Sequence, residues 1–273
     1  MRASILVGVD SSTPSTSAIR WSVGRAAAIG ASVELIHVID SEDTDGAGSV
    51  VRERAANLLR TQLDYARQLR ADVPVSVTLA EGCPPDVLAE RSSGCNLLVV
   101  GTHKTGFIYG RAFGSQFLAL AWRAHCDIAF IPDQRGHDRH GVVAGIEKSS
   151  TGDAIIRCAA AEAVRSSEEL LLVASRTPGA DAPRGENAMA QRAEMVADAL
   201  ALARSAEPQV RVRSTSADRP SPEALVEAST NAALLVIGRR RSALAISGLR
   251  VGNHDVLINI SSPVMVIVDD SAT

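Results

Sequence analysis

The sequence has few aromatic side chains, and this scarcity restricts its partners. Phe, Trp and Tyr together make up 3% of the 273 residues, against 46% for hydrophobic residues of all kinds. Proteins that bind single-stranded nucleic acid stack bases on aromatic rings, and this chain offers few. Its formal net charge is -3, and neither half is basic. We therefore expect a large aliphatic core and binding to neither nucleic acid nor a membrane.

Long hydrophobic runs and closely spaced cysteines are also absent. No apolar segment approaches the roughly 20 residues needed to cross a bilayer, and no secretory leader precedes the first strand-like run. The cysteines, which show no C-x-x-C spacing, are Cys83, Cys95, Cys126 and Cys158. Such cysteines are typical of free thiols in a reducing compartment. These absences together predict a cytoplasmic protein.

Apolar runs alternate with segments of helical periodicity through the first half of the chain. The expected strands are residues 4–9, 32–39, 73–79, 96–100 and 128–131. Ser11, Ser12 and Thr13 are helix-start residues after the first run, and Gly30 is a helix-stop residue. Buried strands that alternate with helices predict a parallel sheet with helices on both faces.

The same pattern returns in the second half at a constant offset of 137 residues. Asp10 aligns with Glu147, and Gly101 aligns with Gly238. One offset shared by separated segments indicates an internal duplication. We therefore predict two tandem domains, residues 1–133 and 141–273, each a doubly wound α/β domain with a five-stranded parallel sheet.

Residues 97–116 combine a strand, a loop and the start of a helix. Gly101 follows the apolar run, and Gly114 and Ser115 precede the next helical segment. Backbone N–H groups at such a turn attract phosphates, although glycine also ends strands for steric reasons alone. The P-loop order Gly-x-x-x-x-Gly-Lys-Ser/Thr does not occur, which excludes a P-loop ATPase. The scattered histidines predict no metal site, and no residue is placed as a catalytic base or nucleophile.

Three features together resemble the universal stress protein family. They are a first strand that ends in Asp10, a second strand that reads Ile-His-Val-Ile-Asp over residues 36–40, and a glycine loop that closes with Gly114 and Ser115. Both halves fit, so the chain is similar to a tandem universal stress protein. The resemblance implies a doubly wound α/β fold and, as in ATP-binding members, an ATP site with Mg²⁺ beside the phosphates.

The resemblance also implies which residues hold the nucleotide. They are Asp10, Val38, Gly101, Lys104, Gly114 and Ser115. Asp10 is implied to lie near the ribose, the backbone of Val38 near adenine, and the glycines with Ser115 around the phosphates. Lys104 stands where the family has a second glycine. Either it supplies a positive charge to a phosphate, or it points into solvent and the loop is closed to nucleotide.

The second half departs further from the family pattern, which implies a degenerate site. Glu147 replaces the aspartate, and Ser175 replaces the second-strand valine. Residues 239–241 are arginines, which either attract phosphate or form a solvated surface. The closing pair, Gly252 and Asn253, is shifted by one residue.

We therefore expect an ATP-binding universal stress protein that acts as a sensor or regulator in stress response, with ATP mainly in the first domain. Any ATP hydrolysis is expected to be slow. Two alternatives stay open: a nucleotide-free protein-interaction module of the same fold, and a slow ATP hydrolase. The edge strands, residues 128–131 and 264–268, are expected to pair with each other within the chain or to form a homodimer.

Overall fold

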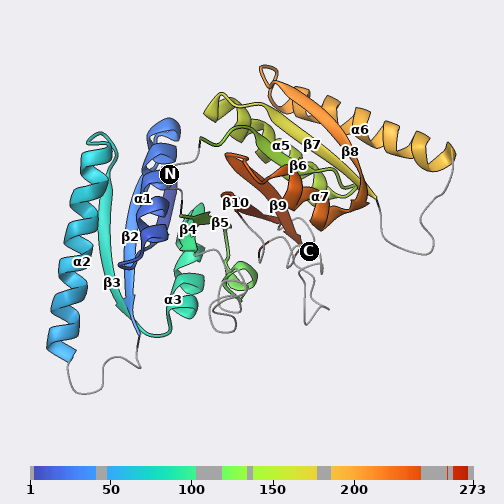
Figure 1. The fold of residues 1–273 in the computed structure, drawn as a ribbon. Coiled ribbons are helices and arrows are strands. Elements are labelled where there is room, and N and C mark those ends of the chain that lie inside the picture. The colour runs from blue at the N-terminus through green and yellow to red at the C-terminus, as the bar shows by residue number, and fades with distance from the viewer. Residues whose placement is uncertain are drawn as a thin grey trace. The chain divides into compact units, whose positions relative to one another are not determined.

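Strands and helices alternate along the chain, as the apolar pattern predicts (Figure 1). The computed structural model describes residues 3–40, 48–102, 119–133, 138–176, 186–240, 257 and 261–269. The chain divides into two compact units, Met1–Arg135 and Gly136–Thr273. Within the described residues, each unit is a parallel α/β sheet with helices packed against it, which confirms the predicted fold class.

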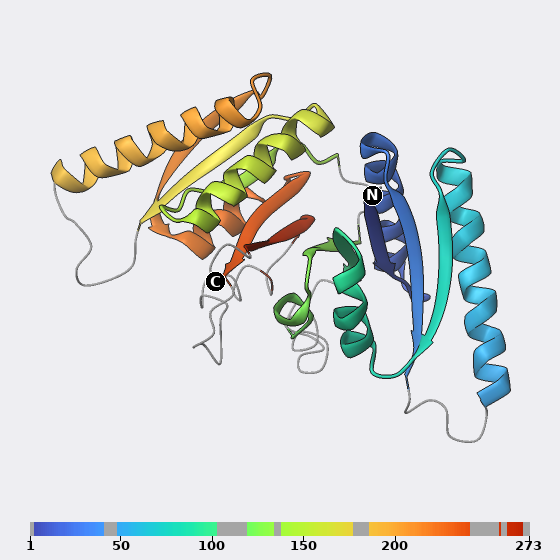
Figure 2. The same cartoon turned by 180° about the vertical axis from the view of Figure 1, so that it is seen from behind.

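The first unit is doubly wound. Its elements are β1 (Ser4–Gly8), α1 (Thr13–Ile29), β2 (Ser32–Ile39), α2 (Gly48–Leu69), β3 (Val75–Glu81), α3 (Pro84–Arg91), a 3₁₀ turn (Ser92–Gly94), β4 (Leu97–Thr102) and β5 (Asp127–Pro132). Its strands are parallel, in the order β3-β2-β1-β4-β5. Helix α1 packs against α2 (Figures 1 and 2). The chain moves outward from β1 through β2 to β3 and then returns past β1 to β4. Because this return runs in the opposite direction across the sheet, a right-handed connection puts α3 on the face opposite α1 and α2.

Helix α1 begins and ends at the residues that the sequence predicts. The N–H of Ser15 donates to Ser12 Oγ at 3.3 Å, and Pro14 occupies the first turn. Gly30 ends the helix with a φ of 66°, a left-handed conformation that glycine adopts without strain. The N-terminus of α1 therefore lies directly beyond the carboxyl end of β1.

The third strand begins two residues later than the sequence predicts. The alternating pattern predicts a strand over residues 73–79, whereas β3 spans Val75–Glu81. The N–H of Val73 donates to Arg70 O at 3.4 Å and closes a turn, and Pro74 has no N–H to donate. The ladder with β2 therefore starts at Val75, opposite Val33.

The second unit repeats the architecture of the first. Its elements are β6 (Val142–Gly145), α5 (Ser150–Ser166), β7 (Leu170–Arg176), α6 (Glu186–Ala206), β8 (Val212–Pro220), α7 (Ser221–Ala228), β9 (Leu234–Arg240) and β10 (Val264–Asp269). Its strands are parallel, in the order β10-β9-β6-β7-β8. The pairing predicted for residues 128–131 and 264–268 stays a prediction.

Individual hydrogen bonds of the two units repeat at the offset of 137 residues. The N–H of Val9 donates to Ile36 O at 2.8 Å, and the N–H of Ile146 donates to Val173 O at 2.9 Å. Both bonds join the residue after the first strand of a unit to the second strand. The duplication seen in the sequence thus extends to the local geometry at the end of the first strand.

Candidate functional site

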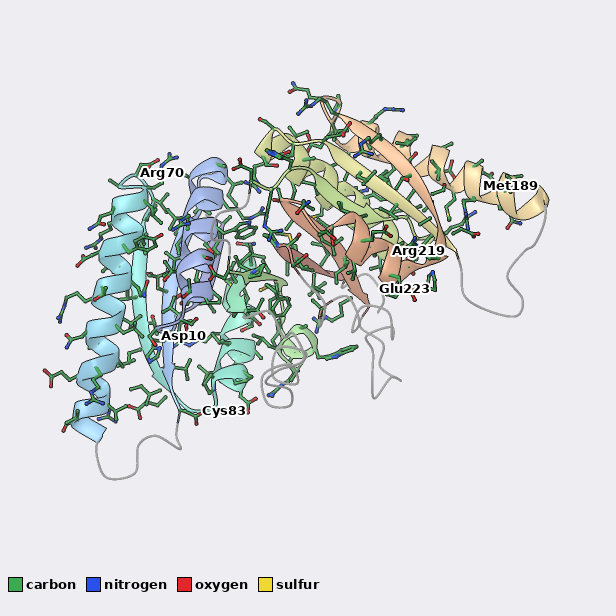
Figure 3. The ribbon with its side chains drawn as sticks, viewed as in Figure 1. Asp10, Arg70, Cys83, Met189, Arg219 and Glu223 are labelled. Carbon is green, nitrogen blue, oxygen red and sulfur yellow. The ribbon has the colours of Figure 1, made fainter. Side chains whose placement is uncertain are left out.

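The strand order of the first unit reverses between β1 and β4. The chain runs from β1 outward through β2 and β3, then returns to the other side of β1 with β4, where Gly8 pairs with Val100. Ligands of open parallel sheets bind beyond the carboxyl ends of the strands at such a reversal. In Figure 3, Asp10 lies toward this end of the unit, as does Cys83, and Arg70 lies at the opposite end. Asp10 therefore flanks the site that topology favours.

Asp10 holds the turn that leads from β1 into α1. Its Oδ1 accepts a hydrogen bond from the N–H of Ser12 at 2.8 Å, and its own N–H donates to Ser15 Oγ at 3.0 Å. The side chain is exposed, so the carboxylate is accessible to a ligand while one of its oxygens organises the backbone. The aspartate therefore stabilises the turn through one oxygen and leaves its carboxylate exposed.

The strand register puts Val38 and Asp10 at equivalent positions. Gly8 pairs with Ile36, so Asp10 and Val38 each lie two residues further along neighbouring strands. Alternate residues of a strand turn their backbone groups to opposite neighbours. Ile36 O accepts from the N–H of Val9 on the β1 side, whereas Ile39 O accepts from the N–H of Gly82 on the β3 side. The backbone of Val38 therefore faces the β1 side, where β1 has already turned toward α1.

His37 is part of this site, although the sequence reasoning placed it among the scattered histidines. Its Nδ1 lies 2.7 Å from Val9 O. Because a carbonyl oxygen only accepts, Nδ1 carries the hydrogen in this bond. If the β1–β2 ladder continued past Val9, the N–H of Val38 would donate to the same oxygen, Val9 O. The position of His37 next to Val38 in the sequence is the signal that could have identified His37 as part of the site.

Gly101 lies inside β4 rather than after it, which corrects the predicted boundary. It pairs with Ile131 of β5, and the strand continues to Thr102. A Cβ added at Gly101 would lie 2.5 Å from Ser15 N and 2.6 Å from Pro14 O, both backbone atoms of α1. The absence of a side chain therefore lets the first turn of α1 lie against β4. This close packing is a steric reason for the glycine that does not involve a phosphate.

A polar hollow of about 340 Å³ lies beside the N-terminus of α1. Hydroxyl-bearing side chains line it, among them Ser12, Thr13 and Thr16, together with Arg20 and Asp133. Arg20 is held by Tyr65, whose hydroxyl oxygen lies 3.0 Å from Nη2. The surroundings of the α1 N-terminus are thus hydrophilic.

Half of the predicted site residues lie outside the described part of the chain. Lys104, Gly114 and Ser115 fall in residues 103–118. The structure brings Asp10, Val38 and Gly101 to the same end of the sheet, and the nucleotide-binding roles of all six residues stay predictions.

The second unit keeps a glycine, Gly238, in place of Gly101 but differs at the counterparts of Asp10, Ser15 and Val38. Glu147 follows β6, and Gly152 takes the place of Ser15; a Cβ at Gly152 would lie 2.9 Å from the backbone carbon of Glu147. The register of the β7–β8 ladder shifts between Ala174 and Arg176. Ser175, the counterpart of Val38, lies at this shift. The backbone geometry at this position is therefore irregular in the second unit and regular in the first.

Arg239 is buried rather than solvated. It is 1% exposed, because β9 continues past it and pairs it with Val268. The surface alternative is therefore wrong for this arginine. The side chains of residues 240 and 241, and all of residues 252 and 253, lie outside the described part of the chain.

The described residues contain neither a metal-binding cluster nor a membrane-spanning helix. No group of three or more His, Cys, Asp and Glu side chains in the described ranges is arranged to hold a metal ion. Within those ranges, no helix combines the length and apolarity that a membrane span requires.

Comparisons with known proteins agree with the geometry. Residues 1–132 match the model of the universal stress protein family. The chain is 27% identical over 297 aligned positions to universal stress protein Rv2623 of Mycobacterium tuberculosis H37Rv, covering 98% of this chain and 97% of that protein.

Two solved structures share the fold over nearly the full length. A universal stress protein of Archaeoglobus fulgidus DSM 4304 covers 97% of this chain and 98% of its own, with a TM-score of 0.72 and 16% identity. A protein of Pseudomonas aeruginosa UCBPP-PA14 covers 99% and 94%, with a TM-score of 0.69 and 17% identity. Residues 1–132 are thus a universal stress protein family domain, the second unit repeats its fold, and the chain over its length is similar to universal stress proteins of two-domain size.

Proposed function

We propose that the first unit binds ATP at the β1/β4 strand reversal and that the protein acts as a cytoplasmic sensor or regulator in stress response. The reversal itself is the observation that carries the proposal, because it gathers Asp10, Val38 and Gly101 at one end of the sheet. The four cysteines lie in the described residues and none of them forms a disulfide there, which supports a reducing compartment.

The nucleoside end of ATP is assigned to Asp10 and Val38. The Asp10 carboxylate is exposed and uses Oδ1 for the turn, so Oδ2 is positioned by that bond to accept from a ribose hydroxyl. The Val38 backbone faces past the end of β1 and presents a donor and an acceptor to the edge of a base. His37 supports this arrangement by donating to the carbonyl of Val9.

The phosphates are assigned to the loop after β4. Gly101 leads into it, and Gly114 and Ser115 supply backbone N–H groups and a hydroxyl near a helix start. Lys104 adds a positive charge. Mg²⁺ would accompany the phosphates, with phosphate oxygens and water as its ligands, as is usual for this ion.

The second unit is assigned no nucleotide. The register shift around Ser175 disturbs the position that would meet adenine, and Gly152 brings the backbone of Glu147 close to α5. Its counterpart residues therefore provide a matched control within the same chain.

Titration calorimetry with ATP on nucleotide-stripped full-length protein tests the proposal. Asp10→Asn is expected to weaken ATP binding about fivefold, because the amide still accepts from the N–H of Ser12 but the charge at the ribose is lost. Glu147→Gln, the equivalent change in the second unit, is expected to leave the affinity unchanged. No heat of binding with the wild-type protein would instead support the nucleotide-free interaction module.

A further inference from the structure

Two cysteines that are distant in sequence meet at the amino ends of β4 and β5. Cys95 precedes β4 and Cys126 precedes β5, and the ladder of the two strands pairs Leu97 with Asp127. Their sulfur atoms lie 3.5 Å apart, although the residues are 31 positions apart in the chain. Both side chains are partly exposed. The contact is at the opposite end of the strands from Asp10, so it belongs to no part of the proposed nucleotide site.

We propose that Cys95 and Cys126 are a redox modification site, which a peroxide converts to a reversible disulfide. A disulfide requires a sulfur–sulfur distance of about 2.05 Å. The thiols are already in contact, and the parallel ladder between β4 and β5 fixes their backbones beside one another. The link therefore requires a side-chain adjustment and no rearrangement of the sheet.

Cys95 is the sulfur that attacks the peroxide. The hydrogen bond from the Cys126 thiol lowers the pKa of Cys95, because it stabilises a thiolate. The same pairing and burial raise the pKa of Cys126. The more acidic thiol supplies the thiolate, and the more basic one stays protonated as its hydrogen-bond donor.

The chemistry balances with hydrogen peroxide as the two-electron oxidant. The Cys95 thiolate attacks one peroxide oxygen, the O–O bond breaks, and the departing hydroxide takes a proton to become water, leaving a sulfenic acid. Cys126 then attacks the Cys95 sulfur. The S–O bond breaks, a second water leaves with the Cys126 proton, and the S–S bond forms. A dithiol such as dithiothreitol reverses the reaction by thiol–disulfide exchange.

The site is confined to the first unit. At the offset of 137 residues, Ala232 and Pro263 stand where Cys95 and Cys126 stand in the first unit. The duplication therefore supplies no equivalent pair, and oxidation would mark one of two similar domains.

Tryptic mass spectrometry of the full chain tests the proposal directly. Cleavage after arginine and lysine puts Cys95 in peptide 92–104, Cys126 in peptide 124–135 and Cys83 in peptide 71–91. After brief treatment with a few equivalents of hydrogen peroxide and alkylation, we expect peptides 92–104 and 124–135 joined, two hydrogens lighter than their sum. Dithiothreitol should separate them. The exposed Cys83 should stay a thiol through the peroxide step and so be found alkylated. Cys83→Ser should leave the 95–126 link unchanged.

The link yield in native and unfolded protein, and the melting temperatures of wild type and cysteine variants, show whether the fold itself directs the oxidation. In unfolding guanidinium, the yield of the 95–126 link should fall at least about tenfold, because the fold no longer holds the thiols together. Oxidation should also raise the melting temperature of the wild type, on the order of 5 °C, and not that of Cys95→Ser or Cys126→Ser. A link as frequent in the unfolded chain as in the native one would overturn the proposal. So would oxidation of Cys95 to a sulfinic acid without linkage to Cys126.

Discussion

Gly101→Ala is expected to lower the free energy of unfolding of the first unit by about 3 kcal/mol or to prevent its folding. An alanine Cβ would lie 2.5 Å from Ser15 N and 2.6 Å from Pro14 O. Both are backbone atoms in the capped first turn of α1, so neither can move aside as the end of a side chain can. Helix α1 would have to separate from β4 to accommodate one methyl group.

Tryptophan fluorescence during urea unfolding measures this effect in the first unit alone. Trp21 and Trp122 are the two tryptophans of the chain, and both lie in that unit. Gly24→Ala is the matched control, because Gly24 lies within α1 and a Cβ there would meet nothing within 4 Å. Removing a mid-helix glycine should stabilise by roughly 0.5–1 kcal/mol. Equal unfolding midpoints for Gly101→Ala and wild type would show that the close approach of α1 to β4 is wrong.

Lys104→Ala is expected to weaken ATP binding about tenfold and to leave adenosine binding unchanged. A lysine that contacts a phosphate contributes a charge-assisted hydrogen bond, which adenosine has no group to receive. Calorimetric titration of both ligands separates the phosphate contribution from the nucleoside contribution. Lys148→Ala is a control, because Lys148 is the other lysine of the chain and lies in the second unit.

Tighter ATP binding by Lys104→Ala would contradict a role of this lysine in binding phosphate. If Lys104→Ala binds ATP more tightly than the wild type, the lysine obstructs the loop instead of serving the phosphate. That outcome would favour the alternative in which Lys104 points away and the native loop is closed to nucleotide.

Local patterns in the sequence were sufficient to predict the α/β alternation and the limits of α1. Ser12 and Gly30 act within a single turn of chain, so their roles can be read from neighbouring residues. The duplication could be predicted because one offset relates Asp10 to Glu147 and Gly101 to Gly238.

Features that depend on packing between distant segments could not be predicted in the same way. The strand continues through Gly101 because β5 pairs with it. Arg239 is buried because β9 continues into a pairing with β10. The contact of Cys95 with Cys126 arises from the parallel register of two strands, and no local spacing encodes it.

Native mass spectrometry of the full chain with saturating ATP tests the central claim most directly. One functional site in the first unit predicts one adenine nucleotide for each chain. It also predicts that Asp10→Asn lowers the bound fraction at limiting ATP, whereas Glu147→Gln does not. A chain that carries no nucleotide at saturating ATP, or one that carries two, would contradict the account.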